Sequence, residues 1–200
     1  MLTLLVATKN EGKIKELIQL LNDLPIKLKS LDDFENILEV AETGKTFAEN
    51  AKLKAESYAV QTNCWTLADD SGLEVEALNN EPGVFSARYA GENSIDEENT
   101  DKLLNELEKT GSNNRRAAFI CVIAVSDDKG KTQYLSKGIC YGTIAEKPKG
   151  TYGFGYDPVF IPDNFDKTFG ELSRDLKQKI SHRAKALRKI IDYFNENTAS

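Results

Sequence analysis

Two adjacent carboxylates are the first feature of this sequence that could do chemistry. Asp69 and Asp70 follow the apolar residues of the segment "LADDSG", and Ser71 and Gly72 come directly after them. Burying neighbouring like charges is costly unless a positive charge or a metal ion lies close by. One alternative is that one carboxylate caps a turn while the other faces water. Because α/β sheets bind ligands where strands end, and carboxylate oxygens suit Mg²⁺, the pair favours metal-assisted phosphoryl chemistry.

A polar loop near the start of the chain could hold phosphate. The segment "TKNEGK" follows an apolar segment and precedes residues with helical periodicity, so it joins a strand to a helix. That arrangement presents backbone N–H groups to an anion. The loop lacks the GxxxxGK[ST] pattern of a Walker A motif, and an ordinary strand-to-helix turn is the alternative.

Two later segments could recognise a base. In "GTYGFGYDP" an aromatic ring could stack on a planar base, or the glycines and aromatics could form a tight turn with core side chains. In "KISHRAKAL" the donors of His182 and Arg183 could read a carbonyl oxygen on a base edge. For Lys185, Arg188 and Lys189 the solvated face of a helix is the favoured interpretation. With one histidine and no GxSxG segment, a serine hydrolase triad is not indicated.

Composition bounds the class of protein. A chain of 200 residues predicts one large domain or two closely packed lobes within residues 1–200. The net charge of −6 argues against a general nucleic-acid binder, while the basic segment 177–189 favours a small anionic ligand. No apolar segment is long enough for a membrane span. Three cysteines without a CxxC pair exclude a disulfide framework and fit a reducing cytoplasm, with Cys121 and Cys140 as core residues.

The elements that must position these residues alternate between strand and helix. Helix 46–61 has a capping box from Thr46 and Glu49, and its mostly apolar face carries Asn50 and Lys54, which we expect to point inward toward a site. The pattern predicts an α/β fold with a mixed twisted sheet and flanking helices. The expected strands are 2–7, 26–31, 65–69, 71–78, two long strands within 117–146 around a turn at 127–130, and 159–162; the other expected helices begin near Lys13 and cover 94–109 and 180–194.

Taken together, the motifs closely resemble the inosine/xanthosine triphosphate pyrophosphatase family. The resemblance extends from Leu5 to about Leu187, and six motifs in one order make it specific. The matching segments are "ATKNEGKIKEL", "TFAENAKLKA", "LADDSGLEVEAL", "PGVFSARYAG", "GFGYDPVF" and "ISHRAKAL".

This resemblance implies a fold and an activity. It implies a homodimer with a nucleotide-binding cleft between two lobes, located in the cytoplasm, with neither nucleic acid nor membrane as partner. The implied reaction is Mg²⁺-dependent hydrolysis of noncanonical purine triphosphates (ITP, dITP and XTP) to the monophosphate and pyrophosphate, which removes deaminated purines from the nucleotide pool. Two alternatives stay open: a nucleotide-sensing module without turnover, and a pyrophosphatase with a broader range of triphosphates.

The resemblance also implies roles for individual residues. Asp70 is the catalytic carboxylate and a metal ligand, Asp69 assists in holding the metal, and Ser71 contacts substrate. Lys54 and Lys177 contact phosphate, and His182 with Arg183 reads the 6-oxo group. The triphosphate-binding loop comprises Thr8, Lys9, Asn10, Glu11, Gly12 and Lys13. The nucleoside-binding loop comprises Phe154, which stacks on the base, and Gly155, Tyr156 and Asp157.

One departure from the family pattern concerns the metal. Members often carry two acids before "TG", whereas this chain reads "VAETG", with Ala41 before Glu42. A metal-associated acid is therefore missing at Ala41, and Glu42, Glu39 or Glu49 could replace it. Glu49 has a competing role in the capping box. How the site excludes GTP, which shares the 6-oxo group, also stays open.

Overall fold

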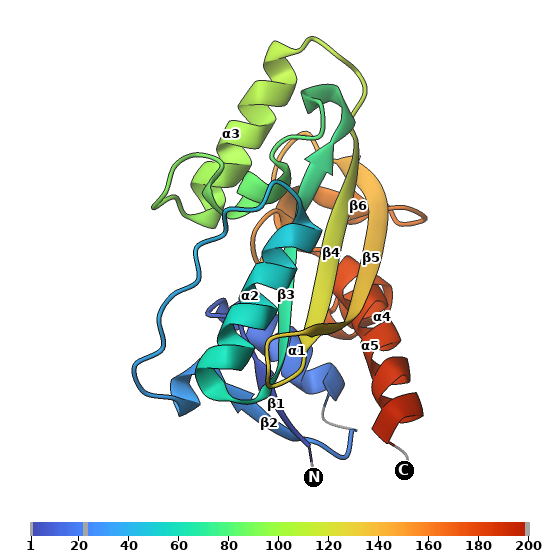
Figure 1. Cartoon of the computed structure of the whole chain (residues 1–200). Coiled ribbons are helices and arrows are strands. Elements are labelled where there is room, and N and C mark those ends of the chain that lie inside the picture. The colour runs from blue at the N-terminus through green and yellow to red at the C-terminus, as the bar shows by residue number, and fades with distance from the viewer. Residues whose placement is uncertain (1, 22–23, 199–200) are drawn as a thin grey trace. The chain divides into compact units, whose positions relative to one another are not determined.

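The computed structural model describes residues 2–21 and 24–198 and confirms the α/β prediction. Its sheet has the strand order β2-β1-β3-β4-β5-β6 (Figure 1). The sheet is mixed, because β1 is parallel to β2 and β3 whereas β6 is antiparallel to β5. The strands are β1 (Thr3–Val6), β2 (Lys27–Ser30), β3 (Trp65–Val75), β4 (Arg116–Ser126), β5 (Thr132–Ile144) and β6 (Phe160–Pro162). The α-helices are α1 (Glu11–Leu21), α2 (Phe47–Thr62), α3 (Asp96–Lys109), α4 (Arg174–Ile180) and α5 (His182–Thr198).

The chain forms two compact units. Of the described residues, unit 1 holds those up to Asp70, the segment Cys121–Gly138 and those from Arg183 onward. Unit 2 holds Ser71–Ile120 and Ile139–His182. The boundary in β3 therefore falls between Asp70 and Ser71.

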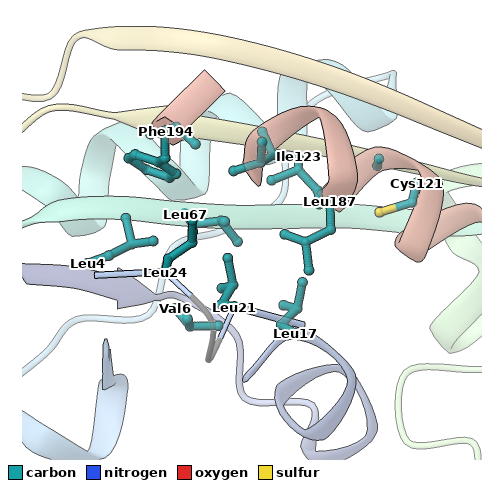
Figure 2. Close-up of a cluster of buried hydrophobic side chains, with 13 residues drawn as sticks. Leu4, Val6, Leu17, Leu21, Leu24, Leu67, Cys121, Ile123, Leu187 and Phe194 are labelled. Carbon is teal, nitrogen blue, oxygen red and sulfur yellow. The ribbon is translucent and has the colours of Figure 1, made fainter. Parts of the chain in front are cut away.

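The core of unit 1 lies between its strands and the helices α1 and α5 (Figure 2). Helical periodicity brings Leu17 and Leu21 of α1, and Leu187 and Phe194 of α5, onto the apolar strand side chains. Every residue of this cluster is under a tenth exposed, so the burial fixes both helices against one face of the strands. Buried strand residues in the cluster are Leu4, Val6, Leu67, Cys121, Ile123 and Val125.

Helix α2 belongs to unit 1 and confirms the predicted capping box. The Thr46 hydroxyl accepts a hydrogen bond from Glu49 N at 3.2 Å, and the Glu49 carboxylate accepts one from Thr46 N at 3.2 Å. The predicted inward face is confirmed as well, since Asn50 is buried and the side chain of Lys54 is only 12% exposed. The cap and the apolar face thus fix the rotation of α2 and aim these two polar groups at the sheet.

The core of unit 2 is rich in aromatic rings. Phe119 of β4 packs against Phe160 of β6 with ring centroids 4.5 Å apart, and Phe160 stacks on Phe169 at 5.5 Å. Helix α3 contributes Leu103 and Leu107 to the same cluster. Both Cys121 and Cys140 are buried, as predicted, with Cys140 in this second core.

Three predicted boundaries were wrong. Strand β3 does not end at the two carboxylates but continues through them to Val75 as one strand. The predicted helix 180–194 corresponds to α5, which begins at His182 rather than Ile180. The preceding helix α4 was not predicted, and Ser181, with extended backbone (φ −66°, ψ 159°), separates it from α5. Helix α1 begins at Glu11 rather than near Lys13. Among the described residues, no helix is both long and apolar enough to cross a membrane.

Candidate active site

Asp69 and Asp70 lie within β3, so their side chains point to opposite faces of the sheet. On one face, Asp69 Oδ2 is 3.1 Å from Lys13 Nζ and 3.4 Å from Arg183 Nε. On the other face, Asp70 Oδ2 accepts a hydrogen bond from Asn50 Nδ2 at 3.1 Å, and Asp70 Oδ1 is 3.6 Å from Lys54 Nζ. The adjacent acids therefore contact different side chains of unit 1, while the charges of Lys13 and Lys54 act on both of them.

Asp69 is a buried anion. Burial by itself raises its pKa, but the charges of Lys13 and Arg183 outweigh burial and hold the pKa of Asp69 well below its usual value. The Cys121 thiol contacts the same carboxylate at 3.9 Å, and burial together with this negative charge raises the pKa of Cys121. Asp69 is thus ionised at neutral pH and the thiol stays protonated.

Asp70 has the opposite shift. Burial raises the pKa of Asp70, and the charge of Glu42 adds to the effect, although Lys54, Lys13 and Asn50 oppose it. Burial lowers the pKa of Lys54, but the charges of Asp70, Asp69 and Glu42 outweigh burial, so its pKa is raised overall. A carboxylate with a raised pKa beside a fixed ammonium group is suited to accept a proton.

Glu42 is the candidate acid that could bind a metal ion together with Asp70. Its Oε1 is 2.5 Å from Lys54 Nζ, so one ammonium group contacts both carboxylates. Glu39 instead forms an exposed ion pair with Lys9 at 3.2 Å, and Glu49 accepts backbone hydrogen bonds in the cap of α2. Of the three open candidates, Glu42 is therefore the one that the structure brings close to Asp70.

The donor chemistry fits a hard divalent cation that keeps part of its water shell. Carboxylate oxygens such as those of Asp70 and Glu42 suit Mg²⁺, which binds through one or two carboxylates plus water and phosphate oxygens. Among residues 2–21 and 24–198, no group of three or more His, Cys, Asp or Glu side chains could hold a metal ion. The residues present thus fit a Mg²⁺ ion whose ligands would come partly from these carboxylates and partly from water and a substrate phosphate. They do not fit a site in which protein side chains supply all the ligands.

The loop before α1 is held by its own polar groups. Asn10 caps the helix, because its Oδ1 accepts a hydrogen bond from Lys13 N at 3.0 Å. The Thr8 hydroxyl accepts one from Asn10 N at 3.2 Å. Lys9 and Glu11 are exposed and Gly12 is partly buried. The cap fixes the first turn of α1, and this turn directs the Lys13 side chain to Asp69.

In unit 2, three of the predicted binding residues form one cluster. Lys177 Nζ is 2.5 Å from Asp157 Oδ2 and lies 4.6 Å from the centre of the Phe154 ring. The same carboxylate oxygen accepts a hydrogen bond from Phe154 N at 2.9 Å. Gly153 has φ +81°, and a Cβ at this position would overlap the Asp157 carboxylate, so glycine is required there.

The predicted base-reading pair divides between the two units. His182 is buried in unit 2 and stacks on Phe119, with ring centroids 4.7 Å apart and planes 12° from parallel. Arg183 is buried in unit 1, where it pairs with Glu16 as well as Asp69. Ser71 is partly buried in β3. Lys185, Arg188 and Lys189 are exposed, as predicted.

Sequence reasoning missed Glu16 and Asp96. Glu16 lies one helical turn after Lys13, so its spacing was a local signal that both could face one site. Asp96 Oδ2 accepts a hydrogen bond from Gly155 N at 2.6 Å, and these residues are 59 positions apart in the chain. No local sequence pattern could indicate the contact between Asp96 and Gly155.

Unit 1 thus brings together buried carboxylates, two lysines that pair with them and a capped strand-to-helix loop. The sequence profile of the Ham1 family matches residues 4–193, and the chain belongs to this family. It is 50% identical over 186 residues to the dITP/XTP pyrophosphatase of Bacillus anthracis, covering 92% of each chain, and 48% identical over 193 residues to that of Geobacter sulfurreducens, covering 96% of each. A solved HAM1 protein from Coxiella burnetii has a TM-score of 0.91 and 42% identity, covering 98% of this chain and 100% of that one. The family predicted from the motifs is confirmed.

Proposed function

We propose that this chain hydrolyses noncanonical purine nucleoside triphosphates, such as ITP, dITP and XTP, to the monophosphate and pyrophosphate. The observation that carries the proposal is the buried Asp70, with its raised pKa, beside Lys54, Asn50 and Glu42. The names of the relatives, dITP/XTP pyrophosphatases at about half identity over nearly the whole chain, supply the substrate class.

The proposed reaction breaks one phosphoanhydride bond. A water oxygen attacks the α-phosphorus, the bond from that phosphorus to the bridging oxygen breaks, and pyrophosphate leaves with the electron pair. Asp70 orients the water and accepts its proton, as its raised pKa favours. Lys13 and Lys54 bind the phosphate oxygens and stabilise negative charge on the leaving group. The ion pair with Asp69 holds the Lys13 side chain in place, and Arg183 pairs with the same carboxylate oxygen.

A divalent metal ion fits the proposed reaction. Asp70 and Glu42 would hold it, with Asp69 a weaker candidate because its Oδ2 already contacts Lys13 and Arg183 on the other face of β3. When bound, Mg²⁺ would supply charge neutralisation at the phosphate oxygens. The residues Thr8 to Lys13 would bind the triphosphate at the start of α1.

Base recognition is proposed for unit 2 together with Arg183. Phe154 would stack on the purine, with Gly155, Tyr156 and Asp157 shaping its loop, and Lys177 would exchange part of its contact with Asp157 for substrate phosphate. His182 and Arg183 would donate to the 6-oxo oxygen of hypoxanthine or xanthine, whereas the 6-amino group of adenine would leave these donors unpaired. Ser71 would contact the substrate.

The proposed setting is a homodimer in the cytoplasm that removes deaminated purines from the nucleotide pool, with neither nucleic acid nor membrane as partner. The nucleotide-binding cleft between two lobes stays a prediction.

Product analysis tests the proposed function directly. The purified chain is incubated with ITP and excess Mg²⁺, and pyrophosphate and orthophosphate are measured separately, with ATP and GTP in parallel. We expect IMP and pyrophosphate from ITP, with ATP and GTP spared. Orthophosphate with IDP would mean attack at the γ-phosphorus and would contradict the mechanism, and binding without turnover would favour a sensing module.

A further inference from the structure

The candidate nucleoside-binding loop, residues 153–157, is attached to a distant segment of unit 2. Gly155 N donates a hydrogen bond to Asp96 Oδ2 at 2.6 Å. The neighbouring Tyr156 hydroxyl donates to the backbone oxygen of Ser86 at 2.8 Å. Both acceptors lie in residues 83–99, which comprise a 3₁₀ turn, a short loop and the start of α3. Two consecutive residues of the loop are thus tied to one support.

The loop needs external ties because of its own sequence. Gly153 and Gly155 have φ of +81° and +60°, which glycine adopts easily but from which it also departs easily. Phe154 lies between these two glycines, so the direction of its ring depends on the backbone on either side. Within the loop, Phe154 N donates to Asp157 Oδ2, and this bond fixes the backbone on the N-terminal side of the Phe154 ring. The hydrogen bond from Gly155 N to Asp96 fixes the backbone on the C-terminal side of the ring.

The support itself is firmly held. The buried Asn99 accepts hydrogen bonds from Ala90 N at 2.7 Å and Ser94 Oγ at 2.9 Å, and donates to the backbone oxygen of Ala87 at 3.2 Å. Ser86 Oγ donates to the Gly83 oxygen at 2.6 Å and accepts from Leu73 N at 2.9 Å. These bonds connect the segment to both β3 and α3. Asp96 therefore projects from a fixed point at the first turn of α3.

We propose that Asp96 is a positioning residue for nucleoside binding. Its carboxylate holds Gly155 N–H, and through it the backbone that directs the rings of Phe154 and Tyr156. Asp96 acts through Gly155 and takes no part in phosphoryl transfer. The inference rests on the proposed function, since it assumes that residues 154–157 bind the nucleoside. It adds a residue outside the recognised motifs to the determinants of substrate affinity.

Three variants separate this role from a general effect on α3. Asp96→Ala removes the acceptor, and Asp96→Asn keeps an oxygen that can accept from Gly155 N–H without the charge. Glu97→Ala is the matched control, because Glu97 is exposed and also contributes an acidic side chain to the first turn of α3. For ITP we expect Asp96→Ala to raise KM about three- to tenfold with kcat nearly unchanged, as for loss of one charge-assisted hydrogen bond. We expect Asp96→Asn to give an intermediate KM and Glu97→Ala to match the wild type.

Amide hydrogen exchange without nucleotide tests the tether separately from the activity. We expect the Gly155 amide to exchange faster in Asp96→Ala than in the wild type or in Glu97→Ala. Unchanged exchange and unchanged KM in Asp96→Ala would overturn the inference, as would equal changes in Asp96→Ala and Glu97→Ala. A wild-type chain that releases no pyrophosphate from ITP would instead contradict the proposed function, while the exchange measurement would still decide whether Asp96 holds the loop.

Discussion

Asp69 and Asp70 are neighbours in the chain, yet their carboxylates contact side chains from opposite faces of the unit 1 strands. Asp69 meets Lys13 of α1 and Arg183 of α5, whereas Asp70 meets Asn50 and Lys54 of α2. Side-chain alternation within β3 separates the two groups, so adjacent like charges need not share one site. The pKa of Asp69 is lowered and that of Asp70 is raised, which predicts different consequences when each charge is removed.

Removing the charge of Asp70 should lower turnover by orders of magnitude without unfolding the chain. In Asp70→Asn the side-chain oxygen can still accept from Asn50, but it cannot take a proton from water or hold a metal ion as strongly. We expect kcat for ITP to fall at least about 100-fold, as for loss of a general base. The measurement is pyrophosphate release, with a thermal unfolding scan to confirm that the variant is folded. Near-normal turnover would refute the assignment of Asp70.

Removing the charge of Asp69 should mainly destabilise the fold. Asp69→Asn leaves Lys13 and the buried Arg183 without their shared carboxylate. We expect the free energy of unfolding to fall by about 3–5 kcal/mol, as when one partner of a buried ion pair is lost. Asp70→Asn is the control and should change it by less than about 1 kcal/mol, because burial already disfavours that charge. Urea titration in the absence of metal ions measures both, and equal losses would contradict the difference between the two faces.

The sequence revealed the local features of the site but not its long-range contacts. The capping box of α2 and the inward face carrying Asn50 and Lys54 follow from helical periodicity, and both predictions were confirmed. The end of a strand at Asp69 was wrongly predicted, because β3 continues from Trp65 to Val75 without a break. Only a continuous strand places the two acids on opposite faces. The pairing of Glu16 with Arg183 joins residues 167 positions apart, so no local pattern could indicate it.

The turn between β4 and β5 should make the free energy of unfolding decrease as the pH becomes acidic. Asp127 accepts hydrogen bonds from Lys131 N and Lys129 N at 3.0 Å each and from Gln133 Nε2 at 2.7 Å, and these donors lower the pKa of Asp127 from its usual value. The unfolded chain therefore binds a proton more readily, so the contribution of Asp127 is complete above the unfolded pKa and is lost as pH falls through the folded pKa.

The corresponding variant is Asp127→Ala. Its urea midpoint should lie below that of the wild type at pH 7, and the difference should shrink as the pH falls below about 4. Asp128→Ala removes the same charge from the same turn but keeps the three hydrogen bonds of Asp127, so it controls for net charge. A difference that stays constant from pH 7 to pH 3 would show that these bonds do not depend on ionisation.

Replacing His182 by phenylalanine separates its packing from its proposed role in reading the base. The His182 ring stacks on Phe119, and a phenyl ring can keep this contact while losing both ring nitrogens. We expect His182→Phe to unfold at a similar temperature to the wild type. The ratio of kcat/KM for ITP over ATP should fall about tenfold, as for one lost hydrogen bond to the 6-oxo group. An unchanged ratio in a folded variant would refute that role.

Glu42 should be the acid that sets the metal requirement. Lys54 Nζ contacts both Glu42 at 2.5 Å and Asp70 at 3.6 Å, so these two carboxylates lie close to each other. Both could therefore serve as ligands of one divalent cation. We expect Glu42→Gln to raise the Mg²⁺ concentration for half-maximal pyrophosphate release about tenfold or more, because an amide oxygen is a weaker ligand than a carboxylate. Calorimetric titration of Mg²⁺ with a non-hydrolysable triphosphate present should show the same loss.

The other two candidate acids provide matched controls. Glu39→Gln removes an exposed charge that pairs with Lys9, and Glu49→Gln keeps an oxygen that can accept from the backbone N–H of Thr46. Because Glu39 pairs with Lys9 and Glu49 caps α2, we expect both variants to keep the wild-type Mg²⁺ requirement. If Glu39→Gln or Glu49→Gln raises the requirement while Glu42→Gln does not, that residue replaces the acid missing at Ala41. If none of the three has an effect, the metal ion is held by Asp70, water and substrate phosphate without a second acid.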